Sequence, residues 1–134
     1  MSYLRWDFDT EYELDPDDPL GKIYIIGDEG ILKDECTMLD IFLGVIADGI
    51  QRIEPGKTIV VDPVIEPDDL IFRAMSNKLS ISYGDQTVII FDQPKFIKDL
   101  KESISKLVEI IDDLKLQAGE DKRELTELRN YIDQ

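Results

Sequence analysis

Alternating apolar and polar residues predict several β-strands in this chain, and the clearest pair forms a hairpin in its second half. Residues 77–83 and 86–92 alternate on either side of Gly84-Asp85, a two-residue loop of the kind that closes tight hairpins. The length of this loop fixes which residues face each other across the hairpin. It predicts one apolar face, which a helix would cover, made of Leu79, Ile81, Val88 and Ile90.

Other segments of the chain have the same strand-like pattern. Residues 3–14 alternate strictly, so one strand would carry Trp6 and other apolar side chains on one face and acidic side chains on the other. Pro16 and Pro19 would end this strand, because proline has no N–H for a β-ladder. Shorter apolar and β-branched runs predict further strands at 22–26, 31–33, 58–62 and 70–75.

A change to three- and four-residue spacing of apolar side chains predicts an amphipathic helix in the middle of the chain. We expect it to begin near Asp34, where either Asp34 or Thr37 can act as the N-cap, and to end before the Pro-Gly pair at 55–56. Gly44 and Gly49 lie inside this helix, although glycine is a poor helix former. We interpret them as points where the helix backbone closely approaches another element.

The C-terminal segment also has helical spacing, and two interpretations fit it. Apolar residues recur in a heptad-like pattern from Ile97 to Ile132, which is typical of a helix with one apolar seam. A continuous helix would expose the end of that seam and favour a homodimer. In contrast, Gly119 followed by the capping pair Asp121 and Glu124 favours a short final helix that folds back. In the first case the oligomerisation surface would contain Leu114, Ala118, Leu125, Leu128 and Ile132.

Together these patterns predict an α+β fold. We expect a mainly antiparallel sheet of six or seven strands, one internal helix and a long C-terminal helix or helical hairpin. Residues 1–111 would form the α+β domain, including the sheet-packing part of the C-terminal helix, and residues 112–134 a helical extension or a fold-back hairpin. A chain of 134 residues is long enough to bury one such core.

The charge of the chain is strongly negative and unevenly distributed. The chain has 30 acidic and 15 basic side chains, a net charge of −15, and residues 1–18 contain seven acidic residues and one basic residue. This excess opposes binding to nucleic acid or to an anionic membrane surface and favours a basic protein partner. The same acidic residues would also serve, without any partner, to keep an edge strand soluble. As candidate partner contacts we select Asp7, Asp9, Glu11, Glu13, Asp15, Asp17 and Asp18.

Few residues suit catalysis or metal binding. The chain has no histidine, and Cys36 is its only cysteine, which excludes an internal disulfide, a Cys/His zinc site and catalytic triads with an imidazole base. The aspartates around Asp15 lack the spacing of a helix–loop–helix calcium site. We therefore predict a protein that is not an enzyme and uses no metal or cofactor.

The N-terminal residues and the apolar runs bear on the location of the protein. The N-terminus shows no apolar core of a signal peptide. The longest uninterrupted apolar run, residues 41–47, is too short to cross a bilayer. We therefore expect a cytoplasmic protein.

Two predicted hairpins, with the sequences GKIYIIGDEGIL and ISYGDQTVIIFD, are separated by the apolar helix and followed by the closing helix. Over residues 20–111 this order resembles small bacterial immunity-type proteins, and it also resembles other small single-domain proteins of bacteria. Immunity-type proteins neutralise a cognate toxin by binding it, so the resemblance implies a binding function. We therefore predict an acidic protein-binding module, such as an inhibitor of a nuclease-like toxin. The alternative is a self-associating structural or assembly subunit that uses the C-terminal helix.

Overall fold

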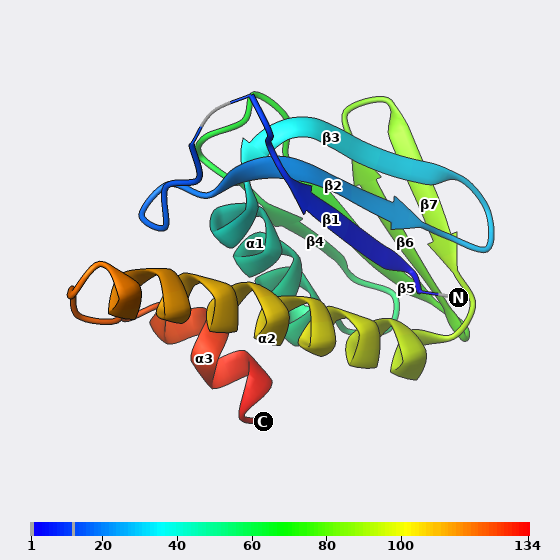
Figure 1. Ribbon diagram of the computed structural model, residues 1–134. Coiled ribbons are helices and arrows are strands. Elements are labelled where there is room, and N and C mark those ends of the chain that lie inside the picture. The colour runs from blue at the N-terminus through cyan, green and yellow to red at the C-terminus, as the bar shows by residue number, and fades with distance from the viewer. Residues whose placement is uncertain (1, 12) are drawn as a thin grey trace.

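The computed structural model describes residues 2–11 and 13–134 and has an α+β fold (Figure 1). Within these residues, seven strands form two antiparallel sheets, and three helices accompany them. The strands of the first sheet are, in order, β1 (Leu4–Phe8), β2 (Leu20–Ile26) and β3 (Ile31–Met38). Those of the second are β4 (Thr58–Val61), β5 (Leu70–Met75), β6 (Lys78–Tyr83) and β7 (Gln86–Ile90). The helices are α1 (Leu39–Arg52), α2 (Gln93–Gln117) and α3 (Thr126–Ile132). The predicted fold class is confirmed, although the strands form two sheets instead of one.

The two sheets meet edge to edge where the β2–β3 turn and β3 approach β7. Glu29 and Ile89 exchange two backbone hydrogen bonds, of 3.2 and 2.8 Å. The side chain of Gln86 continues the junction, since it accepts from the N–H of Lys33 at 2.9 Å and donates to the Lys33 carbonyl at 3.0 Å. Only glycine fits at position 30, because a Cβ atom there would lie 2.3 Å from the carbonyl oxygen of Thr87. β1 and β4 are the edge strands of the two sheets that lie away from this junction.

The hairpin predicted between residues 77 and 92 has the expected register. Leu79 pairs with Ile90, and Ile81 pairs with Val88. All four side chains are buried in the core. The helices lie together on one side of the strands in Figure 1, where α1 packs against both sheets and α2 against β1.

The two glycines inside α1 have different surroundings. A Cβ atom at Gly49 would lie 2.2 Å from the ring of Phe72 on β5, so the predicted close approach is confirmed there. At Gly44 the nearest atom belongs to Leu128 of α3 and would lie 3.8 Å away, which is an ordinary van der Waals distance. The first glycine therefore lets α1 sit against the sheet, and the second faces the C-terminal helix.

The N-terminal strand is shorter than predicted. β1 ends at Phe8, which pairs with Gly21, and the prediction of one strand over residues 3–14 is therefore wrong. The cause is its partner, because β2 begins only at Leu20, after Pro19, and offers no backbone beyond that point. Strict alternation in the sequence cannot show where the neighbouring strand stops.

The start of the central helix also differs from the prediction. α1 begins at Leu39, because β3 continues through residues 34–38 and pairs with β2 as far as Met38. Asp34, expected as an N-cap, instead accepts a hydrogen bond of 2.7 Å from the hydroxyl of Tyr83. Burial and this hydrogen bond raise the pKa of Tyr83. Thr37 is buried in the strand, and no side chain caps α1.

The last residues of the chain fold back, as one of the two interpretations of the C-terminal segment expected. α2 ends at Gln117, the chain turns at Gly119 with φ +71°, and α3 packs against α2 and α1. α3 begins after Leu125, so Asp121 and Glu124 do not form the expected capping pair. Arg129 holds α3 to α2 through two hydrogen bonds to Asp112, of 2.7 and 3.1 Å.

The fold-back changes the surroundings of the predicted oligomerisation residues. Leu128 is buried, with 4% of its surface exposed, and Leu125 and Ile132 are partly buried against the same core. Leu114 is half-buried and Ala118 is exposed. These five side chains therefore form no continuous exposed seam in the single chain. Among the described residues, no helix combines the length and hydropathy needed to span a membrane.

Candidate functional site

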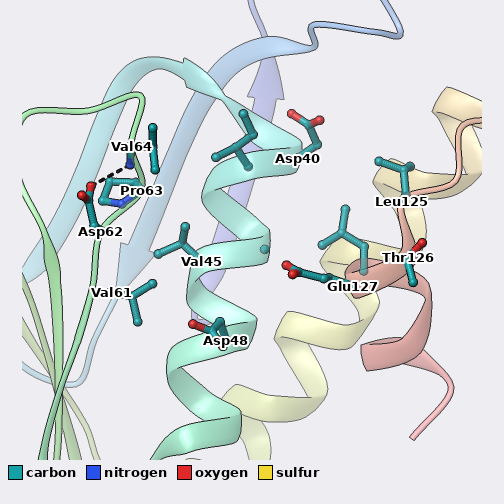
Figure 2. Close-up of a pocket in the computed structure, with 13 residues that line it drawn as sticks. Asp40, Val45, Asp48, Val61, Asp62, Pro63, Val64, Leu125, Thr126 and Glu127 are labelled. Atoms are coloured by element: carbon teal, nitrogen blue, oxygen red, sulfur yellow. Dashed lines mark hydrogen bonds between the residues drawn. The ribbon is translucent and has the colours of Figure 1, made fainter.

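A groove runs along the outer face of α1, between the end of β4 and the start of α3 (Figure 2). It has a volume of about 490 Å³. Its floor is formed by Ile41, Gly44 and Val45, which follow one another at helical spacing on α1. One wall consists of residues 61–64 and the other of residues 125–128. Since Gly44 has no side chain, the middle of the floor is open.

The rim of the groove is acidic. Four carboxylate side chains line it, and within the described part of the chain no lysine or arginine does. These side chains are Asp40, Asp48, Asp62 and Glu127. The groove therefore combines an apolar floor with a negative rim, an arrangement that suits an apolar group bearing a positive charge.

The four carboxylates differ in the ion pairs and hydrogen bonds that they already form within the chain. Asp40 is only 8% exposed, and its Oδ2 atom lies 3.0 Å from an Arg123 guanidinium nitrogen. The Oδ1 atom of Asp40 is buried without a hydrogen-bond partner among the residues described. Asp48 pairs with Arg52 at 3.2 Å on the solvent side of α1. Asp62 accepts a hydrogen bond of 2.8 Å from the N–H of Val64, and this local turn shapes the end of the β4 wall.

Both walls contain a residue with a left-handed backbone. Val64 has φ +69° and Leu125 has φ +42°, a region that β-branched and bulky residues rarely adopt. Such conformations cost roughly 1–3 kcal/mol and are concentrated in ligand-binding sites. Val64 is also 86% exposed, which places an apolar side chain at the rim of the groove. Each wall of the groove therefore contains one residue with an unfavourable backbone conformation.

The predicted N-terminal contacts do not form the expected row of charges. Asp7 lies on β1, 3.9 Å from Arg5 and opposite Lys22 on β2. Asp9 and Asp15 follow the strand, and each accepts a hydrogen bond from a backbone N–H two residues further along. The prediction that these acidic side chains form a row along one strand is wrong, because it required a strand that continued to residue 14.

The remaining N-terminal acids lie in the loop between β1 and β2. Asp17 forms a 2.6 Å ion pair with Lys115 of α2, and this contact, with a second one to Glu120, raises the pKa of the Lys115 amine. Glu11, Glu13 and Asp18 are exposed, and Asp9, Glu13, Asp15 and Asp18 border one small hollow. Tyr12, expected on the apolar face of the strand, lies outside the described residues. A partner-binding role for these acids stays a prediction.

The groove itself was not predicted. Its three parts are α1, residues 61–64 and residues 125–128, which are distant in the sequence. Two signals were available: Gly44 inside an apolar helix, and the apolar pair Val64-Ile65 between acidic residues. Comparisons with protein-family models, with curated proteins and with solved structures found no match. The site is therefore interpreted from its own chemistry.

Proposed function

We propose that this protein is a non-catalytic acidic binding module that accepts a basic segment of a partner protein in the groove beside α1. The observation that carries this proposal is the lining of the groove, an apolar floor with four carboxylates and no basic residue among the described lining residues. Asp40 and Asp48 are already paired with arginines outside the lining, so Asp62 and Glu127 are the carboxylates that remain for a partner. The net charge of −15 supports the same choice of partner, because it attracts basic proteins and repels nucleic acids and acidic proteins.

Lysine and arginine side chains match both features of the groove. Their aliphatic stems can lie on apolar surface while the charged ends remain at the rim. In this groove the stems would contact Ile41 and Val45, and the charged ends would reach Asp62 and Glu127. The exposed acids of the β1–β2 loop, such as Glu11 and Asp18, would add to the long-range attraction and accelerate association at low salt.

As a more specific form of this proposal, the partner is a toxin whose basic active-site surface is covered by the module. The order of elements over residues 20–111, which resembles immunity-type proteins, supports this form. A nuclease is one suitable class of toxin, since a surface that binds nucleic acid phosphates is basic and would accept an acidic inhibitor instead. A cytoplasmic location belongs to the same proposal.

Selection from a displayed library of random peptides tests the general proposal. We expect the selected peptides to be rich in lysine and arginine, and to bind more weakly as the salt concentration rises. The double variant Asp62→Lys/Glu127→Lys should weaken their binding by about tenfold or more, since two rim charges are reversed. Binding is measured by fluorescence anisotropy with purified protein.

The matched control is Glu109→Lys/Asp133→Lys, which reverses two exposed charges outside the groove and gives the same net charge. It should retain most of the affinity. Selected peptides without excess positive charge, or an equal loss in both double variants, would contradict binding in the groove.

A further inference from the structure

We infer that the partner segment binds as an additional β-strand along the free edge of β4, with alternate side chains entering the groove beside α1. This inference rests on the proposed function, because it describes how the basic segment is held. It adds the conformation of that segment and the backbone that recognises it.

The outer edge of β4 has no strand beside it. β4 is the last strand of its sheet and pairs only with β5. In the part of the chain that the structure describes, Thr58–Val61 make no backbone hydrogen bond outside that pairing. An edge of this kind presents unpaired N–H and C=O groups that can pair with another extended chain.

β4 is short, but its four residues include no charged residue, proline or bulge. Proteins commonly place charged residues, proline or a bulge in edge strands to prevent pairing. The four residues of β4 are Thr-Ile-Val-Val, and the side chain of Val60 is 50% exposed. Val64 and Ile65, just beyond the strand, are exposed as well. The apolar surface thus continues from the edge to the rim of the groove.

The position of Val61 connects the edge with the groove. Its side chain lines the groove opposite Val45 (Figure 2), and in a strand Ile59 points to the same side. A strand added beside β4 would therefore direct every second side chain to that side, where α1 and the acidic rim lie. Basic side chains at those positions would meet Asp62 and would compete with Arg52 for Asp48. The intervening side chains would lie beside Val60 on the outer face.

Charge complementarity selects a basic segment of another protein over a second copy of this chain. Each copy has a net charge of −15, so two copies of this chain repel each other. A basic segment instead has opposite charge to every ionisable side chain in the groove lining. The occupant is thus an extended segment in which lysine or arginine alternates with apolar residues.

The test uses a capped peptide in which lysine alternates with valine, and two N-methylated analogues. In an extended chain the N–H groups of alternate residues point to opposite edges. Methylation of every lysine amide therefore blocks one edge of the peptide, and methylation of every valine amide blocks the other. Both analogues keep the same charge, so attraction to acidic side chains alone does not distinguish them.

We expect one analogue to bind the full-length protein at least tenfold more weakly than the unmodified peptide, and the other to bind about equally. Titration of isotope-labelled protein should also shift the amide signals of Thr58–Val61. Equal binding by both analogues, or an equal loss in both, would overturn the strand inference while leaving binding to a basic segment intact. Absence of binding by the unmodified peptide would overturn the inference as well. In that case the library selection separately decides whether the proposed function also fails.

Discussion

The two edge strands that lie away from the junction of the sheets, β1 and β4, are integrated into the molecule to different degrees. β1 and the residue before it contact α2: the indole N–H of Trp6 donates to the carbonyl of Ser103 at 3.2 Å, and the N–H of Tyr3 donates to Asp99 at 2.9 Å. β4 rests on α1 through one face, and its other face and its edge are open. Both strands expose one face and one edge, but β1 is also tied to a helix by the hydrogen bond of Trp6.

The sequences of the two strands explain the difference. β1 reads Leu-Arg-Trp-Asp-Phe, in which charged side chains alternate with large apolar ones, so it carries its own protection against pairing. β4 is composed of one threonine and three branched apolar residues. A region that contributes stability can tolerate few changes, whereas a region that binds a partner should tolerate changes in the free protein. Substitutions in the two strands can test this distinction.

The largest expected effect is the loss of the Trp6 side chain. Trp6→Ala removes a buried indole that stacks edge-on against Phe8 and lies under Lys106, so it should lower the free energy of unfolding by about 3–5 kcal/mol. The matching change on the other edge, Val60→Ala, should cost less than about 1 kcal/mol, because that side chain is half exposed. Chemical denaturation measures both. A similar cost for the two variants would show that β4 is as well integrated as β1.

A smaller effect is expected at the contact that holds α3, one wall of the groove, to α2. Asp112→Asn weakens the hydrogen bonds from Arg129 and should lower the free energy of unfolding by about 1–2 kcal/mol at neutral pH. The hydrogen bonds from Arg129 lower the pKa of Asp112 from its ordinary value of 3.8. These hydrogen bonds therefore contribute their full stabilisation at pH values above 3.8. The stabilisation is lost as the pH falls through the lowered pKa that Asp112 has in the folded protein.

The difference between the wild type and Asp112→Asn should therefore be constant near neutral pH and should shrink in acid. Denaturation at several pH values measures it. Asp113→Asn is the control, since Asp113 is an exposed neighbour on α2 and its replacement should have little effect at any pH. A difference that persists unchanged in acid would show that the ion pair is not its source.

Sequence patterns predicted local structure well where both partners of an interaction are close along the chain. The loop Gly84-Asp85 fixed the register of its hairpin, and Gly119 indicated the fold-back of the final helix. The prediction of β1 was too long because its partner begins at Leu20, a limit that residues 3–14 do not contain. The helix start was wrong because pairing with β2 keeps residues 34–38 extended.

The candidate site depends on the same kind of long-range information. The acidic N-terminus was visible as a composition bias, but the ion pair of Asp17 with Lys115 of α2 joins residues that are distant in the sequence. The groove combines α1 with residues 61–64 and 125–128, and only the packing of α3 onto α1 brings these segments together. Composition therefore showed the negative charge of the protein, whereas the position and shape of the groove required the fold.

The smallest expected effect concerns Val64, where the open edge passes into the rim of the groove. Val64→Gly should remove the energetic cost of the left-handed backbone at this position, but glycine loses more conformational entropy on folding. The net result should be a free energy of unfolding that is higher by only about 0–1 kcal/mol. Ile65→Gly is the matched control, because Ile65 has no positive φ, and it should be destabilising by about 0.5–1 kcal/mol. If both variants lose the same stability, the backbone at Val64 is not strained. A stabilised Val64→Gly that binds basic peptides more weakly would show that this residue serves binding at a cost to the free protein.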